Sequence, residues 1–309
     1  MLPTPALLFV PAALLHCGLR NGRKAAWLTL ALALTMHIPS FIGISRATAE
    51  GRLDIAVFTG LVLCIGIPAL LALPLIQRAE SFGRVLMSSM AAAVGGMALT
   101  EIGIRAIFAF SPYAELVAGA NTMTRQAIEV YRKAGVPFDA LQEVQRLMGY
   151  GIVVLPATFL IMIAMAFVLS LLLVGRLRVW RDLAARRPEG EHAFATYYFR
   201  NLSLPDWLLF AFIAGGLTPV LSGPLQAIAA NLLTLVAFLY LLQGLAILRS
   251  VLATTGASSL SMLFGFLLLA ILSFTWIPQL LLSITGLFDS FFDFRHFKRK
   301  DDSHESHTD

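Results

Sequence analysis

The chain has 309 residues, of which 58% are hydrophobic and only 13% are charged, whereas a typical soluble domain carries about 25% charged residues. Together with a mean hydropathy of +0.79, this composition excludes a soluble enzyme, a disordered chain and a secreted scaffold held by disulfides. The net charge of +5 fits the basic cytoplasmic loops of a membrane protein, and we expect no nucleic-acid partner. The lipid bilayer is therefore the first partner that the sequence predicts.

Eight or nine apolar segments are long enough to cross a bilayer, which takes about 20 residues in a helix. The last apolar stretch is too long for one helix, and Pro278 can divide it into two. No Lys or Arg precedes Arg20, so we expect the first segment to remain as a membrane helix rather than a cleaved signal peptide. The segments cover residues 2–18, 25–44, 55–76, 85–110, 151–174, 207–222, 226–248, 256–276 and 278–292. The sequence thus predicts an all-α polytopic bundle of 8–9 transmembrane helices, forming one domain over residues 1–297.

Basic residues are distributed unequally between alternate loops. One set of loops holds 16 of the 23 Lys and Arg residues, and the opposite set holds 6. The first set consists of loops 19–24, 77–84 and 175–205, Arg249 and the tail from Arg295, and the second of loops 45–54 and 111–149. Because cytoplasmic loops are enriched in basic residues, we predict a bacterial cytoplasmic (inner) membrane protein with its N-terminus outside and its C-terminus inside. This orientation requires a turn at Pro278, since one tilted helix over 256–292 would place the basic tail outside.

The long insert at 111–149 is predicted to be extracytoplasmic and to form two amphipathic helices. Apolar residues recur at spacings of three and four, first over 116–134 and then over 141–148. Residues 135–137 (Gly-Val-Pro) separate the two runs, and Asp139 is a candidate N-cap of the second helix. The pair can lie on the bundle or at the lipid surface, or it can form a lid over a substrate site.

The predicted cytoplasmic loop 175–205 begins with a cluster of arginines. It can anchor to anionic lipid headgroups, or it can dock a cytoplasmic protein. The arginines are Arg176, Arg178, Arg181, Arg186 and Arg187. The tail at 298–309 is charged and has no apolar periodicity, so we predict that it is disordered.

Two charged residues, Glu101 and Arg105, lie inside segment 85–110, where a charge costs at least about 2.5–3.5 kcal/mol. A spacing of four places both on one helix face, where each can offset part of the desolvation of the other. They are candidates for a polar site that takes a substrate or a proton. Alternatively they form an ion pair that reaches the outer interface, because Phe110 ends the segment.

Polar side chains also occur in segment 226–248 and at the end of the chain. Asn231, Tyr240 and Gln243 can line a binding cavity, or they can join helices by interhelical hydrogen bonds. The cluster at the cytoplasmic end of the last segment is a candidate to hold that end against a neighbouring helix, and it consists of Asp289, Asp293 and Arg295. The predicted substrate-binding residues are therefore Glu101, Arg105, Asn231, Tyr240 and Gln243.

Small residues and prolines predict local packing without identifying a ligand. Small residues four positions apart, such as Ala92 with Gly96 and Ala211 with Gly215, favour close helix contacts. Pro68 and Pro74 each remove a backbone hydrogen bond, which predicts kinks in segment 55–76.

Catalytic motifs are absent from the sequence. The chain has no Walker loop, HExxH, GxSxG or CxxC. Cys17 and Cys64 lie in apolar runs, where cysteine is usually a small core residue, and they form no zinc-ligand pattern. We therefore expect no enzymatic activity, no cofactor and no metal.

Three stretches of the second half resemble the YybS-like family of bacterial polytopic membrane proteins, a family without an assigned activity. FRNLSLPDWL at 199–208 resembles its F-x-x-x-x-L-P-x-W-L motif. NLL at 231–233 and YLLQGLA at 240–246 resemble one of its helices, and GLFD at 286–289 with FDFR at 292–295 resembles its closing motif. The resemblance implies a fold similar to the substrate-binding membrane components of energy-coupling-factor transporters, which bind a vitamin or metabolite and rely on a separate ATPase and coupling subunit.

Two functions from different classes follow from these observations. The first is a small-solute binding or transport component without its own energy source, whose partners would be a small-molecule ligand and a coupling or ATPase subunit. The alternative is a structural or assembly membrane protein that docks a cytoplasmic partner through loop 175–205.

Overall fold

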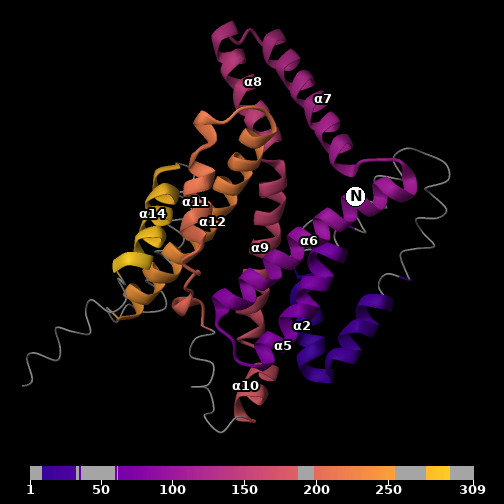
Figure 1. Ribbon diagram of the computed structural model, residues 1–309, viewed down its shortest axis with the longest axis vertical. Helices are drawn as coiled ribbons and strands as arrows, with labels where there is room; N and C mark the ends of the chain where they lie inside the picture. The colour runs from indigo at the N-terminus through magenta and orange to yellow at the C-terminus, as the bar shows by residue number, and fades with distance from the viewer. Residues whose placement is uncertain are drawn as a thin grey trace, which may run out of the picture. The chain divides into compact units, whose positions relative to one another are not determined.

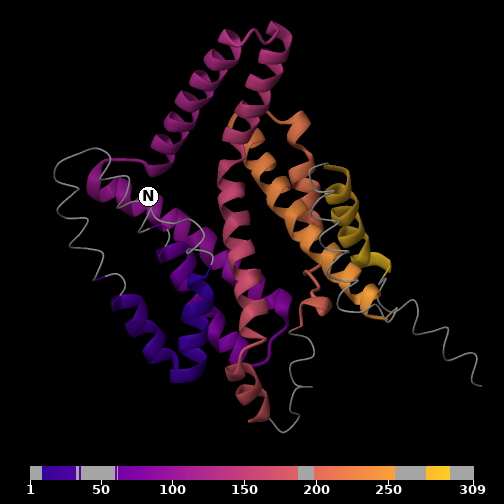
Figure 2. The same ribbon diagram turned by 180° about the vertical axis from the view of Figure 1, so that it is seen from behind.

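Helices account for all the regular secondary structure of the described residues, and no strand occurs among them. The computed structural model describes residues 9–32, 35, 60, 62–186, 198–254 and 276–292. The predicted all-α class is therefore confirmed for this part of the chain (Figures 1 and 2). The chain forms two compact units, one of residues 1–78 and 85–188 and the other of residues 79–84 and 189–309. We describe each unit by itself.

Within the described part of the chain, three helices are long and apolar enough to cross a membrane: α6 (Phe82–Phe108), α9 (Leu155–Val174) and α12 (Gly223–Thr254). Shorter apolar helices lie at Val62–Gln77, Leu208–Val220 and Ile277–Phe292. These helices support the prediction that the chain is a membrane protein. The count of 8–9 spans stays a prediction, because residues 36–59 and 255–275 lie outside the described part of the chain.

The N-terminal unit is built around α2 (Val10–Asn21), which packs against α5 (Ile67–Gln77) and α9. Gly18 permits the close approach of α2 and α5, because a Cβ at this position would lie 2.4 Å from Leu73 Cδ1. Gly22 then turns the chain with a φ of +86°, and residues 23–32 are again helical. The absence of a side chain at Gly18 and Gly22 thus determines both the packing and the end of the helix.

The helix before α6 is distorted, as the two prolines of this segment predict. A π-helix, η1 (Val62–Gly66), precedes α5. Pro68 explains the change of register, because it has no amide hydrogen to donate to the carbonyl of Cys64, four residues earlier. π-Helical turns are rare in proteins overall, but those that occur are often found at functional sites. Pro74 lies inside α5.

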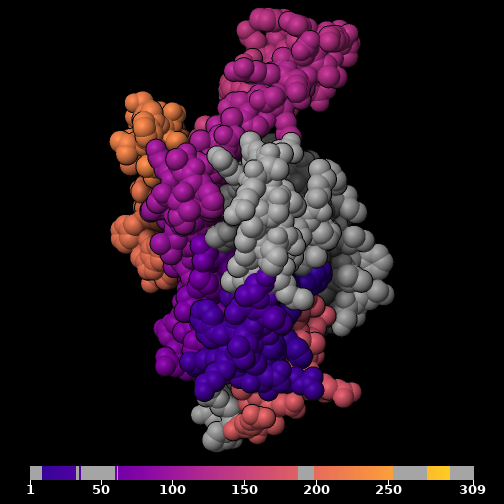
Figure 3. All heavy atoms as spheres, turned by 90° about the vertical axis from the view of Figure 1, so that its right-hand side faces the viewer, coloured from indigo at the N-terminus to yellow at the C-terminus, as the bar shows by residue number. Residues whose placement is uncertain are grey.

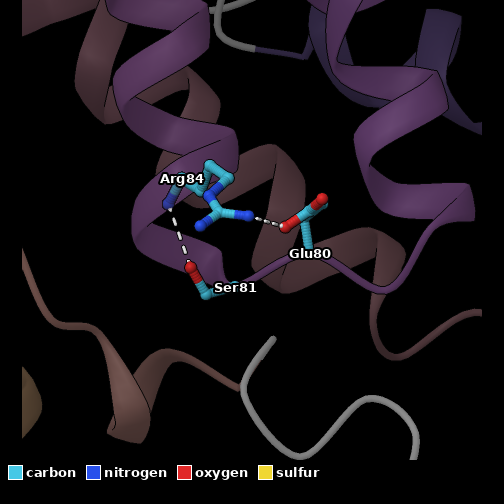
Figure 4. A network of polar contacts seen from close by, with 3 residues as sticks. All are labelled: Glu80, Ser81 and Arg84. Atoms are coloured by element: carbon cyan, nitrogen blue, oxygen red, sulfur yellow. Dashed lines mark hydrogen bonds and ion pairs between the residues drawn. The ribbon is translucent and has the colours of Figure 1, made fainter.

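A local polar network precedes α6 (Figure 4). The Ser81 hydroxyl accepts a hydrogen bond from the Arg84 amide at 3.3 Å, which satisfies one of the free donors of the first helical turn. Arg84 also forms an ion pair with Glu80 at 2.5 Å. Two thirds of the Arg84 side chain is exposed, and such surface pairs contribute about 0–1 kcal/mol. The serine therefore starts the helix, and the ion pair adds little.

The predicted pair of helices in the insert is observed as α7 (Pro112–Lys133) and α8 (Phe138–Val153), which pack against each other. Gly135 separates them with a φ of +80°. Asp139 is not the N-cap, which is Pro137, and the prediction for Asp139 was wrong by two residues. A proline without an amide hydrogen can precede the first turn at little cost, and Asp139 then lies in that turn, where its charge favours the helix.

The helix pair projects from the N-terminal unit, as the space-filling view shows (Figure 3). Among the residues of α7 and α8, only Pro112 and Leu141 are buried. Large apolar side chains such as Met123, Phe138 and Leu147 are more than 60% exposed. The pair does not lie flat on the helices of its own unit. Its extracytoplasmic location remains a prediction.

The amphipathic helix α10 (Arg178–Ala185) follows α9 in the basic loop. Trp180 and Ala184 are buried on one face of this helix, which packs against α2. Arg178 and Arg181 are exposed on the other face. Arg178 and Arg181 are therefore available to lipid headgroups or to a protein, as both interpretations of the loop require.

The C-terminal unit consists mainly of α11 (Leu208–Gly216), α12 and α14 (Trp276–Phe292), with α12 packed against the other two. In the segment predicted at 207–222, the α-helix α11 ends at Gly216, and the 3-10 helix η4 (Thr218–Val220) follows it. Pro219 explains this break, because it has no amide hydrogen to donate to the carbonyl of Gly215, four residues earlier, and the Thr218 hydroxyl donates to that carbonyl instead at 2.6 Å. α14 begins two residues before Pro278, which therefore lies in the first turn, where proline is tolerated.

Candidate functional site: an apolar cavity beside Glu101

A cavity of about 550 Å³ lies in the N-terminal unit. Its walls come from the second half of α6, the first turns of α7 and α9, and the π-helix η1 with the neighbouring Gly60. The lining residues are Gly60, Cys64, Val94, Met97, Ala98, Thr100, Glu101, Pro112, Tyr113, Leu116, Leu155, Pro156, Phe159 and Leu160. This volume lies within the range of about 300–1,000 Å³ that is typical of small-molecule sites.

The wall on the side of η1 depends on a close contact between α6 and the π-helix. A Cβ at Gly96 would lie 2.7 Å from the carbonyl oxygen of Leu63. This confirms the close contact predicted at Gly96. The neighbouring Thr100 donates from its hydroxyl to the Gly96 carbonyl at 2.7 Å and is buried. The hydroxyl hydrogen of Thr100 is thus used within its own helix. The methyl group of Thr100 is the atom nearest to a Cβ built at Gly60.

Glu101 is the charged residue of the cavity wall, and it holds the start of α7. One carboxylate oxygen accepts a hydrogen bond from the Ser111 hydroxyl at 2.5 Å, and the other accepts from the Tyr113 amide at 3.1 Å. Ser111 in turn accepts from the Ala114 amide at 3.1 Å as the N-cap of α7. A negative charge at a helix N-terminus interacts favourably with the exposed amides and the helix dipole. Glu101 thus fixes α7 where Pro112 and Leu116 enter the cavity wall.

The predicted pairing of Glu101 with Arg105 is wrong. Among the described residues, no ion pair joins the two side chains, and Arg105 is exposed and does not line the cavity. The physical reason is that the N-terminus of α7 offers Glu101 a hydroxyl and an amide donor in place of the guanidinium. The spacing of four permits an ion pair but does not require one.

The other three predicted binding residues belong to the C-terminal unit and line no cavity described here. Asn231 donates from its amide to the Ala227 carbonyl of its own helix at 2.8 Å. Tyr240 is buried, and its ring packs edge-on against Phe212, with ring centroids 6.0 Å apart. Their role in binding a substrate stays a prediction.

Gln243 joins three parts of the C-terminal unit. It is only 2% exposed. Its side-chain oxygen accepts from the Leu204 amide at 3.1 Å, and its nitrogen donates to an Asp289 carboxylate oxygen at 3.2 Å. This geometry supports the interpretation of Gln243 as a connection between helices. Asp289 thus holds α14 against α12, while Asp293 and Arg295 lie outside the described residues.

The residues that carried the family resemblance meet around this glutamine. A Cβ at Gly244 would lie 2.1 Å from the carbonyl oxygen of Leu282, and one at Gly286 would lie 2.0 Å from that of Tyr240. The two glycines therefore allow α12 and α14 to cross in direct backbone contact. The motifs at 199–208, 240–246 and 286–289 thus describe one packing arrangement of the C-terminal unit.

The sequence did not reveal most of the cavity. The start of α7 carried a recognisable signal, because Ser111 followed by Pro112 is a typical N-cap and first helical residue. That signal could have placed a helix N-terminus ten residues after Glu101. The apolar lining residues, such as Phe159 and Met97, cannot be distinguished from other lipid-facing or core residues of a membrane helix.

Comparison with known proteins agrees with the helical, apolar architecture. A family model described as predicted membrane protein (DUF2232) matches residues 1–290. No curated protein and no solved structure matches the chain. The family match includes the helices that form the cavity and those that cross at Gly244 and Gly286. The chain therefore belongs to the DUF2232 family of predicted membrane proteins.

Proposed function

We propose that this protein is a small-solute binding or transport component of the bacterial cytoplasmic membrane, without its own energy source, and that the cavity beside Glu101 is its binding site. The observation that carries the proposal is an apolar cavity of about 550 Å³ with a carboxylate on its wall. Ligand sites are usually apolar pockets with a few polar groups that orient the ligand. The sequence has no catalytic motif, so binding is a better interpretation than catalysis.

The resemblance to the YybS-like family supports a partner for this function. That family is similar to substrate-binding membrane components that rely on a separate ATPase and coupling subunit. A chain without a nucleotide-binding motif cannot itself hydrolyse ATP, so ATP-driven uptake through this protein would require such a partner. The exposed arginines of α10 offer a surface on which a cytoplasmic subunit could dock.

Filling the cavity should abolish ligand binding. We expect at least one compound of a metabolite panel to raise the melting temperature of the purified protein, because ligands that bind only the folded state stabilise it. Ala98 lines the cavity, so Ala98→Trp should remove this shift. Ala91→Trp is the matched control, because Ala91 lies on the same helix, is exposed and does not line the cavity.

Two results would contradict the proposal. One is a ligand-induced shift that survives Ala98→Trp unchanged, which would place the ligand elsewhere. The other is no shift with any compound, together with a protein that crosslinks stoichiometrically to loop 175–205. That combination would favour the structural or assembly function.

The orientation of the chain is part of the proposal. The bias of basic residues, 16 against 6 of 23, supports an N-terminus outside and a C-terminus inside. A cysteine introduced at Ser303 should then react with a membrane-impermeant maleimide only after the cells are opened, in a background in which Cys17 and Cys64 are replaced by serine or alanine. Labelling of this cysteine in intact cells would exclude the turn at Pro278.

A further inference from the structure

The position of the cavity along its helices bears on the kind of ligand it accepts. The lining residues of α6 fall at 94–101 of a helix that ends at Phe108, and those of α9 fall at 155–160, in its first turns. The cavity therefore brings the second half of α6 together with the first turns of α9. Exposed apolar side chains such as Leu99 and Ile102, both more than 60% exposed, lie on α6 beside its cavity-lining residues.

The walls of the cavity divide into a long apolar part and one polar end. Val94, Met97 and Phe159 belong to the apolar part, which makes no hydrogen bonds with a ligand. The polar end consists of Glu101 and the first turn of α7. A carboxylate accepts hydrogen bonds at about four positions, and Ser111 and Tyr113 occupy two of them. The remaining positions accept donors, and they repel an anion in a low-dielectric surrounding.

We propose that the cavity binds a single-chain amphiphile whose polar end donates hydrogen bonds, either a neutral alcohol or a cationic amine, and that it discriminates against the corresponding carboxylate. At about 30 Å³ for each water-sized group, the volume of about 550 Å³ accommodates roughly 18 such groups. That is about the size of one hydrocarbon chain with a small head. This inference rests on the proposed function and specifies the substrate class of the same site.

Photocrosslinking tests the proposal directly. The full-length protein in phosphatidylcholine nanodiscs is incubated with octadecylamine that carries a diazirine on its chain, irradiated and mapped by peptide mass spectrometry. We expect saturable crosslinks to residues 94–101 and 155–160. Unlabelled octadecylamine and octadecanol should compete at least tenfold more effectively than octadecanoic acid at neutral pH.

Three variants identify the origin of the crosslinks. Ala98→Trp should remove them, whereas Ala91→Trp should leave them unchanged. Glu101→Gln keeps the shape of the side chain and removes its charge, so it should reduce the preference for amine over acid at least fivefold without abolishing binding of the alcohol. Circular dichroism and size-exclusion profiles like those of the wild type establish that each variant is folded.

Each remaining outcome decides against the proposal. Crosslinks that do not saturate, or that Ala98→Trp leaves unchanged, would show bulk lipid contact only. Equal competition by amine and acid, or a preference that survives Glu101→Gln, would exclude the assigned role of the carboxylate. If a water-soluble metabolite shifts the melting temperature of the wild type but not of Ala98→Trp, and no amphiphile competes, the amphiphile inference fails while the proposed function stands. If neither class of compound binds, both fail.

Discussion

Replacement of Gly286 by leucine should strongly destabilise the C-terminal unit. A Cβ at this position would lie 2.0 Å from the carbonyl oxygen of Tyr240 and 2.9 Å from the amide nitrogen of Gly244. Both are backbone atoms of α12, so no side-chain rotation relieves the clash, and the two helices have to separate. Overpacking typically costs 1–3 kcal/mol and sometimes more, and we expect about 3 kcal/mol or more here. Because folded proteins are stable by only about 5–15 kcal/mol, this cost removes a large share of the stability, and the yield of folded protein should fall.

Fluorescence-detected size-exclusion chromatography of a fusion protein measures this effect as the yield of the monodisperse peak. Gly216→Leu is the matched control, because a Cβ at Gly216 meets no described atom within 4 Å. It should give a wild-type profile. An unchanged peak for Gly286→Leu would show that α12 and α14 do not cross in backbone contact.

The second large effect is expected for Gln243→Leu. This substitution should lower the free energy of unfolding by about 2 kcal/mol. The change leaves the buried amide of Leu204 without its acceptor, and leaving a buried donor unsatisfied costs about 1–3 kcal/mol. It also removes the donor to Asp289. Both losses act at the place where the 202–204 stretch, α12 and α14 are joined.

Denaturant unfolding in mixed micelles measures the free energy of unfolding of this variant. Gln226→Leu serves as the control, because Gln226 lies on the same helix and is exposed, and exposed substitutions usually change stability by less than about 0.5 kcal/mol. Equal effects of the two substitutions would contradict the connecting role of Gln243. A shift of ligand affinity without a loss of stability would restore its predicted role in binding.

The sequence predicted the helices well where hydrophobic length decides the outcome. The spans expected at 85–110 and 226–248 correspond to α6 and α12, and the helices of the insert occur with their break at Gly135. Helix ends were less predictable, because competing caps differ by fractions of a kcal/mol. Asp139 shows this, since Pro137 takes the position expected for it.

The candidate site was predictable in only one of its residues. A charge inside a membrane segment is unfavourable enough to mark Glu101 from sequence alone. Its partners were not predictable, because the choice between Arg105 and the start of α7 depends on where the chain returns after Phe110. Gln243 was marked because a side-chain amide in a membrane segment needs hydrogen-bond partners, and its contacts with Leu204 and Asp289 supply them.

The succession of α8 and α9 has a practical consequence for imaging. The 20 residues of α9 rise about 30 Å, which is the thickness of the hydrocarbon layer, and α8 continues from its start with a break of one residue at Val154 (Figure 1). The 16 residues of α8 add up to about 24 Å of helix beyond the start of α9. The turn at Gly135 is an attachment point for a rigid fusion partner or an antibody fragment, which would give this small membrane protein an alignment marker for electron cryo-microscopy away from its cavity.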